Sequence, residues 1–122
     1  MAITSAICNS FKVQILTGTH NFTVTSGDTF NLALYTSSAT LNKSTTVYIT
    51  TNEVATATGY TAKGKALTSV TPVLSSDTAV CDFANASWTS ASFTARGCLI
   101  FNDSVATDPA VCAIDFGGDK TV

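Results

Sequence analysis

The sequence is poor in charge, in proline and in histidine. Its 122 residues include only six Lys and Arg, eight Asp and Glu, two prolines and one histidine. The net charge of −2 is spread along the chain, and Lys63 and Lys65 are the only close basic pair. A protein that binds nucleic acid normally presents a basic stripe that displaces counterions from the phosphates. We therefore expect no nucleic-acid partner.

Long apolar runs are also missing. No segment approaches the ~18 consecutive apolar residues that a membrane-spanning helix requires, so we expect no membrane partner. Residues 1–18 lack a basic n-region and contain polar residues throughout, unlike a secretory signal peptide. A signal that was already removed is the alternative, and Met1 argues against it. We expect a protein that is made and used without secretion.

Small hydroxyl residues dominate what is present. Threonine occupies 22 positions and serine 13, while 45% of the chain is hydrophobic. That apolar content excludes an intrinsically disordered segment. Abundant Thr, Val, Ile, Phe and Tyr with little charge favour strands over a helical bundle. Because the length fits one domain and no repeat or compositional break marks a second, we predict a single β-rich domain over residues 1–122.

One segment has helical periodicity. The apolar residues recur every four positions, at Ile3, Ile7, Phe11 and Ile15. This spacing gives a single apolar stripe on a helix surface. We predict one N-terminal α-helix over residues 4–16, with its stripe packed on a sheet and Phe11 in the core.

From residue 21 onward, alternation with a period of two replaces the helical period. The clearest runs of β-branched and aromatic residues are 29–35, 45–51, 66–74, 79–83, 92–101 and 110–116. Gly, Asn, Asp and Ser turns separate them, as in antiparallel β proteins. Pro72 cannot donate to a ladder and therefore indicates an edge strand. We predict strands over 21–117 in an antiparallel β-sandwich or partial barrel, of the jelly-roll or immunoglobulin-like type.

The chain has four cysteines: Cys8, Cys81, Cys98 and Cys112. They show no Cys-x-x-Cys spacing, whereas a zinc site needs ligands clustered at short spacings, usually with His, so we expect no metal. In a hairpin that joins 97–102 to 110–116, Cys98 falls opposite Cys112, within the Cα separation that a disulfide spans. A disulfide between these two and a pair of reduced, buried thiols both remain open.

No catalytic constellation can be assembled. A His-dependent mechanism must use His20, and no Gly-x-Ser-x-Gly motif surrounds any serine. The carboxylates that could formally pair for glycoside hydrolysis are Asp28, Glu53, Asp77 and Asp82. Nearly all of them lie beside turns, where Asp hydrogen-bonds its own backbone. We expect no catalytic residues, no cofactor and no enzymatic activity.

Trp88 and Phe93 form an aromatic pair in a polar stretch of the sequence. Such a pair can stack on a sugar or contact a partner protein. More often, such residues close the end of a sandwich core. Both interpretations remain open.

Several strings of residues resemble a known family. They are Met-Ala-Ile-Thr-Ser-Ala-Ile-Cys-Asn-Ser-Phe-Lys (1–12), Asp-Thr-Phe-Asn-Leu-Ala-Leu-Tyr-Thr-Ser-Ser-Ala-Thr-Leu-Asn (28–42), Gly-Tyr-Thr-Ala-Lys-Gly (59–64), Ala-Arg-Gly-Cys-Leu-Ile-Phe-Asn (95–102) and Asp-Phe-Gly-Gly-Asp-Lys-Thr (115–121). Over nearly the whole chain, they resemble the small structural proteins of tailed bacteriophages. Members of that family carry no catalytic motif to transfer.

The resemblance implies a virion structural protein that decorates or cements the capsid. It would bind and stabilise the lattice of the major capsid protein as a homo-oligomer, on the capsid surface, after assembly in the host cytoplasm. The alternative is a tail, fibre or neck component that contacts host surface glycans through Trp88 and the loops near it.

This chain departs from the resemblance in two ways. Relatives usually continue beyond the Gly-Gly-Asp-Lys segment with another Thr-rich strand, so we expect that a final strand is lost, lies outside this sequence or is supplied by a neighbour. Cys81, Cys98 and Cys112 stand where the resemblance implies small or apolar residues. That difference favours disulfides within or between subunits.

Overall fold

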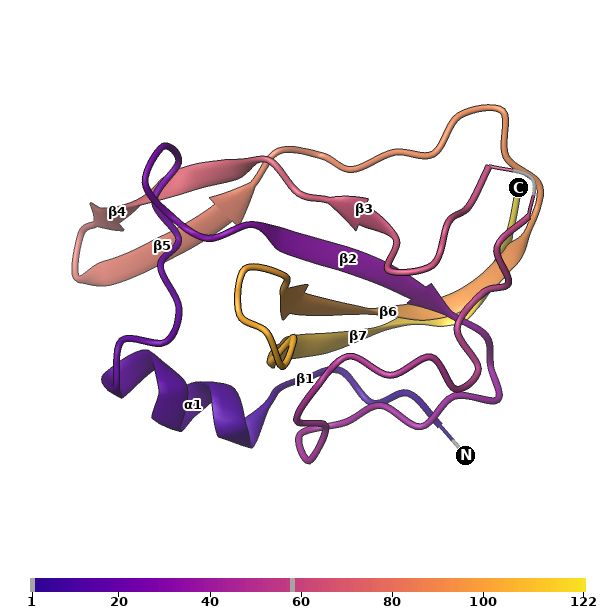
Figure 1. The fold of residues 1–122 in the computed structure, drawn as a ribbon, viewed down its shortest axis with the longest axis horizontal. Coiled ribbons are helices and arrows are strands. Elements are labelled where there is room, and N and C mark those ends of the chain that lie inside the picture. The colour runs from indigo at the N-terminus through magenta and orange to yellow at the C-terminus, as the bar shows by residue number, and fades with distance from the viewer. Residues whose placement is uncertain (1, 58) are drawn as a thin grey trace.

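The chain folds into two antiparallel sheets and one short helix (Figure 1). The computed structural model describes residues 2–57 and 59–122. The elements are β1 (Ala6–Ile7), α1 (Asn9–Leu16), β2 (Phe30–Tyr35), β3 (Lys65–Ala66), β4 (Ser69–Ser75), β5 (Thr78–Phe83), β6 (Thr94–Asn102) and β7 (Ala110–Thr121). The prediction of a mainly β fold with antiparallel sheets and one N-terminal helix is confirmed.

The larger sheet has five strands in the order β1-β7-β6-β2-β3, and β4 and β5 form a separate two-stranded ribbon. In Figure 1 the ribbon and α1 project on the same side of the molecule, with the segment that joins α1 to β2 running between them. The two sheets do not close into a barrel. This open arrangement is consistent with the predicted sandwich or partial barrel.

One face of the five-stranded sheet carries the main core. Ala33 lies opposite Leu99, which lies opposite Ala113, and all three are at most 1% exposed. Ile3 and Leu41, from segments outside the sheet, cover this face and form a parallel bridge with each other. Burying a Leu or Ile side chain completely contributes about 1.5–3 kcal/mol each. The layer between the sheet and these covering segments therefore contributes to stability, alongside two further buried clusters around Tyr60 and Phe30.

The helix is shorter than predicted, and its stripe belongs to the core only in part: Ile3 is buried and Phe11 packs against the core, whereas Ile7 and Ile15 are exposed. It begins at Asn9 because residues 6–7 pair with β7 instead, and the Cys8 N–H donates to the Val111 carbonyl (2.9 Å). Pairing at a sheet edge has overridden the helical periodicity. None of the eight described residues of α1 is buried, and Phe11 is half-buried. Within the described part of the chain, no helix is long and apolar enough to cross a membrane.

The strand predictions are correct in part. The runs 29–35, 66–74, 79–83, 92–101 and 110–116 overlap the observed strands. The run 45–51 is irregular and makes only an isolated bridge from Val47 to Pro109. The strands also extend past 117, because β7 continues through the Gly117-Gly118 pair to Thr121. β4 is an edge strand as expected, and Pro72 lies where its register shifts between Val70 and Val73.

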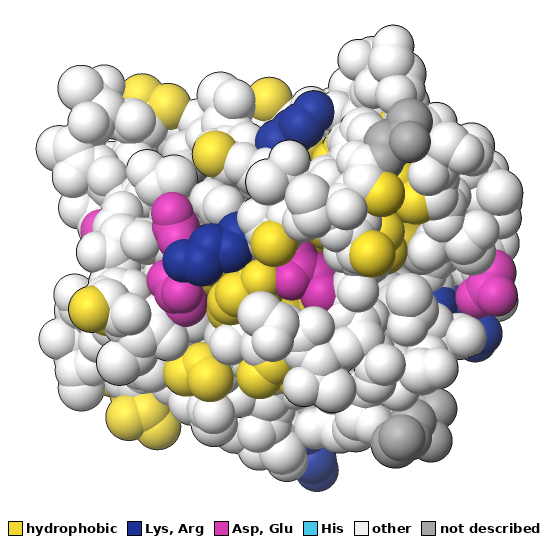
Figure 2. All heavy atoms as spheres, turned by 45° about the vertical axis from the view of Figure 1, so that its right-hand side comes forward, with side chains coloured by type: hydrophobic (Ala, Val, Ile, Leu, Met, Phe, Trp, Pro, Cys, Tyr) yellow, Lys and Arg dark blue, Asp and Glu magenta, His cyan; other side chains and the backbone are white. Residues whose placement is uncertain are grey.

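Charged side chains are sparse on the surface. Figure 2 shows one face, on which basic and acidic side chains occur in small mixed groups and neutral atoms cover most of the area. Among the described residues, ion pairs join Lys63 with Asp103 and Asp108, and Arg96 with Asp115.

Candidate functional site

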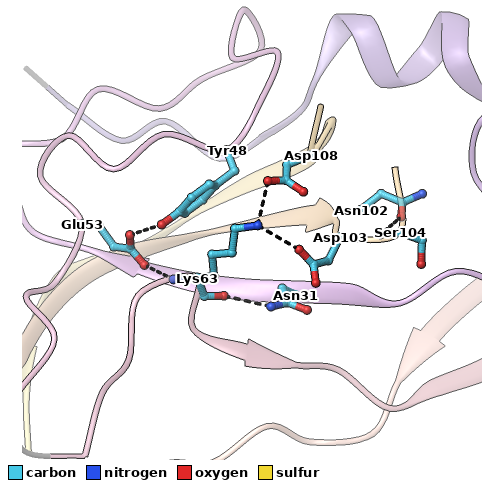
Figure 3. Close-up of polar contacts among 8 residues, drawn as sticks. All are labelled: Asn31, Tyr48, Glu53, Lys63, Asn102, Asp103, Ser104 and Asp108. Carbon is cyan, nitrogen blue, oxygen red and sulfur yellow. Dashed lines mark hydrogen bonds and ion pairs between the residues drawn. The ribbon is translucent and has the colours of Figure 1, made fainter. Parts of the chain in front are cut away.

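A polar cluster around Glu53 holds the irregular segment before β3 against the sheet (Figure 3). The Glu53 carboxylate accepts hydrogen bonds from the Tyr60 hydroxyl (2.6 Å), the Lys63 backbone N–H (2.8 Å) and the Tyr48 hydroxyl. The Tyr60 hydroxyl in turn accepts from the Leu34 N–H of β2 (2.9 Å). Glu53 therefore serves as a shared acceptor for three parts of the chain.

Lys63 links this cluster to the loop between β6 and β7. Its Nζ lies 3.2 Å from Asp103 Oδ1 and 3.0 Å from Asp108 Oδ2, as Figure 3 shows. Its backbone adopts a left-handed φ of 74°, and its carbonyl accepts from Asn31 Nδ2 (3.1 Å). Both aspartates therefore already have a cationic partner.

The phenols and the ammonium of this cluster are held in their protonated forms. Burial, and then the hydrogen bond to Glu53, raise the pKa of Tyr48 and of Tyr60 above the ordinary value for tyrosine. The hydrogen bonds to Asp108 and Asp103 raise the pKa of Lys63. The Glu53 carboxylate and both aspartates therefore have their donors within this chain. We interpret the cluster as a structural one.

His20, the single imidazole, is buried away from that cluster. It is 8% exposed, and its two ring nitrogens contact Asn102 Nδ2 (3.0 Å) and Gln14 Oε1 (2.8 Å). Neither partner is a nucleophile, so the structure brings no Ser or Cys to the ring through these contacts. This placement offers no triad geometry.

The four carboxylates considered for paired acid-base chemistry are separated. Asp28 contacts Asn102, and Glu53 lies in the cluster of tyrosines. Asp77 lies between β4 and β5, and Asp82 lies on β5. Among residues 2–57 and 59–122, no three His, Cys, Asp or Glu side chains are grouped to hold a metal ion.

The predicted register of the cysteine hairpin is wrong. Cys98 lies opposite Ile114, and Cys112 lies opposite Ile100. Cys98 and Cys112 are therefore offset by two positions, and all four thiols are free. Burial raises the pKa of Cys98 to about 12 and that of Cys112 to about 11. Protonated, buried thiols oxidise slowly, since the thiolate is the reactive form.

Trp88 and Phe93, the predicted partner or glycan patch, both lie at the edge of the core. Both are half-buried and face Tyr60, with ring centroids 6.3 Å and 5.7 Å from its ring. Lys65 Nζ lies 5.0 Å from the centroid of the Trp88 ring. A hollow of about 220 Å³ lies beside the two aromatic residues. The two side chains therefore mainly contact the core, and a ligand that reached them would bind in the hollow beside them.

The sequence did not reveal that the β4–β5 ribbon is exposed. In these two strands, all of whose residues the structure describes, none is buried. The large apolar residues that face solvent are Val70 (45% exposed), Val73 (61%), Leu74 (73%) and Val80 (39%). Because an isolated two-stranded ribbon is marginally stable in water, exposed apolar groups on it point to a binding surface. In the sequence, only Pro72 pointed to this exposure, because it indicates an edge strand.

An apolar groove of about 490 Å³ lies beside the ribbon. One wall is formed by Val80 and Cys81 of β5, and the other by Phe11 and Ile15 of α1 together with Phe22. Ligand and peptide sites of this size are typically apolar and concave. The exposed ribbon and the groove together, here called the ribbon surface, are the strongest candidate functional site.

Comparisons with protein-family models, with curated proteins and with solved structures find no match for this chain. The function is therefore inferred from the chain's own residues. The polar cluster stabilises the fold, whereas the ribbon surface is exposed, apolar and uncovered.

Proposed function

We propose that this protein is a virion structural protein that binds the lattice of a major capsid protein and stabilises it. The observation that supports the proposal most directly is the ribbon surface. Leu74 and Val73 are 73% and 61% exposed on a two-stranded ribbon in which no residue is buried by the described part of the chain. Large exposed apolar groups cost solubility and are characteristic of surfaces that another protein covers.

The partner proposed here is the major capsid protein, with further copies of this chain beside it. The resemblance of residues 28–42 and 95–102 to structural proteins of tailed phages supports this partner. The sparse charge also fits, because many nearly neutral copies can crowd on a lattice without strong mutual repulsion.

The free edges of the ribbon supply a mode of attachment. β4 and β5 pair only with each other in the part of the chain that the structure describes. Each therefore offers backbone donors and acceptors along its outer edge. A strand from the lattice could add to such an edge and place its apolar side chains in the groove.

Co-sedimentation with purified particles tests the proposal. Val73→Asp places a charge on the ribbon, and Val13→Asp places the same charge on α1, where Val13 is 63% exposed and does not line the groove. The expected result is that Val73→Asp abolishes binding to particles, whereas Val13→Asp binds like the unaltered protein. Equal binding by the two variants would contradict a docking role for the ribbon.

The alternative is a tail, fibre or neck component that contacts host glycans, and the hollow beside Trp88 and Phe93 is the observation that favours it. Trp88→Ala would then abolish binding on a glycan array, and Trp88→Phe would retain part of it by stacking. Lys65 covers the Trp88 ring and would have to move first. Glycan binding that is unaffected by Trp88→Ala would contradict this alternative.

A further inference from the structure

A buried chain of hydrogen bonds connects α1 to the end of β6. Gln14 of α1 contacts His20 (2.8 Å), His20 contacts Asn102 (3.0 Å), and Asn102 contacts Asp28 (2.8 Å). Asn102 is fully buried and His20 is 8% exposed. The chain thus bridges the helix, the segment between α1 and β2, and the sheet.

The direction of each hydrogen bond in this chain is fixed. Asn102 Oδ1 accepts from the Ser104 N–H (3.0 Å), so the Asn102 amide nitrogen is the atom that faces both Asp28 and His20. An amide NH₂ can only donate, which makes His20 Nδ1 an acceptor without a proton. The ring proton is then on Nε2, where it is donated to Gln14 Oε1. The site therefore requires neutral histidine.

A second ring proton has no place in this arrangement. It would sit on Nδ1 and point at the amide hydrogens of Asn102. Turning the Asn102 amide over would place its oxygen against the Asp28 carboxylate and its NH₂ against the Ser104 N–H. Either way, protonation of His20 breaks at least one hydrogen bond in a buried setting, where a polar group without a partner is destabilising.

The surroundings of the ring add to this preference. Phe11, Phe22 and Phe30 lie with ring centroids 4.9, 6.3 and 6.0 Å from that of His20. Among the described residues, Asp28 is the charged group whose field acts on the ring, while α1 and β6 contribute the neutral Gln14 and Asn102. Burial outweighs the attraction of Asp28, so the pKa of His20 lies below its ordinary value of 6.5.

We propose that the hydrogen bonds of His20 form a pH-dependent switch, here called the latch. At neutral pH they hold α1 and residues 17–29 on the sheet, and in mild acid protonation of His20 releases them. Phe11 and Ile15 of α1, together with Phe22, form one wall of the apolar groove. Release of this wall opens the groove and exposes its apolar floor. The latch is independent of the proposed lattice partner, because all its contacts lie within this chain.

An NMR titration of the isolated protein from pH 7.5 to pH 4.5 tests the latch. The His20 ring signals should titrate with a midpoint below 6.5. The signals of α1 and Phe22 should move at that same midpoint, while those of β6 and β7 stay fixed. Each pH unit below the midpoint should shift the closed-to-open ratio by up to about tenfold. A His20 midpoint at or above pH 6.5 would overturn the proposal. So would α1 signals that do not change at the His20 midpoint.

Two variants separate the latch from general acid sensitivity. His20→Gln retains a donor and an acceptor but cannot take up a proton, so its α1 signals should remain unchanged through the same titration. Combining Asp28→Asn with Asn102→Asp keeps the net charge and turns a carboxylate toward Nδ1. That exchange should raise the His20 midpoint and keep α1 closed in acid. Unchanged acid release of α1 in His20→Gln would contradict the latch even if the double variant fails to fold.

Discussion

The Tyr60 hydroxyl donates to the Glu53 carboxylate across 2.6 Å. The same hydroxyl accepts the Leu34 N–H (2.9 Å), at a point where β2 has passed the end of the two-residue β3. One phenol therefore satisfies a buried backbone donor of the sheet and a carboxylate of the irregular segment. This pair explains how a long segment with little regular structure is held in place.

Tyr60→Phe should lower the free energy of unfolding by about 1–3 kcal/mol, because it leaves the Leu34 N–H and one Glu53 oxygen without this partner. Urea denaturation measures the change. Tyr48→Phe is the matched control, since Tyr48 is less buried and loses only the Glu53 contact. If Tyr60→Phe lowers the free energy of unfolding no more than Tyr48→Phe does, the hydrogen bond between the Leu34 N–H of β2 and the Tyr60 hydroxyl does not contribute to stability.

Two leucines should respond very differently to truncation. Leu99 is fully buried in the main core, and Leu99→Ala should cost about 2–5 kcal/mol in the free energy of unfolding. Leu74 is 73% exposed on the ribbon, and Leu74→Ala should change it by less than about 0.5 kcal/mol. Thermal or chemical denaturation distinguishes them. A large cost at Leu74 would mean that the ribbon is covered within the isolated chain.

Acid should destabilise the protein through His20. Burial, offset in part by Asp28, lowers the pKa of His20 in the folded state below 6.5, its value in the unfolded chain. The unfolded chain therefore binds the proton more readily. This contribution to stability is complete above pH 6.5 and is lost as the pH falls through the folded pKa. Urea denaturation between pH 7.5 and pH 4.5 should show the loss, and His20→Gln should remove it. A loss of equal size in His20→Gln would assign it to other groups.

The thiols should differ in reactivity by their exposure. Cys81 is exposed, whereas Cys8 and Cys98 are buried. In the folded protein, a thiol reagent should modify Cys81 first, and Cys81→Ser should remove that fast phase. After unfolding without reductant, all four thiols should react. A shortfall of two thiols would instead indicate a disulfide such as the one considered between Cys98 and Cys112.

The sequence predicts the fold class well because composition determines it. Abundant β-branched residues and few charges leave little choice except strands. The start of the helix could not be predicted, because Ile3 and Ile7 keep a helical spacing while the free edge of β7 pairs with residues 6–7. β7, the strand that pairs with these residues, lies far along the chain, and a local sequence pattern carries no information about it.

The candidate site could be predicted only in part. Apolar and polar residues alternate in 69–83 in the same way whether or not another layer covers the ribbon. The exposure of Leu74 therefore could not be predicted from this pattern. His20 was identified as the single imidazole, but its partner Asn102 is 82 positions away. Trp88 and Phe93 are close in sequence, but the contact that each makes with Tyr60 depends on the fold and could not be predicted.

A cryo-EM map of the intact particle tests the central proposal most directly. The proposal predicts density for this chain over the capsid surface, at a copy number comparable to that of the major capsid protein. It also predicts that β4 and β5 face the lattice, with Val73 and Leu74 covered. Density confined to the tail, or a capsid-bound chain whose ribbon faces solvent, would contradict it.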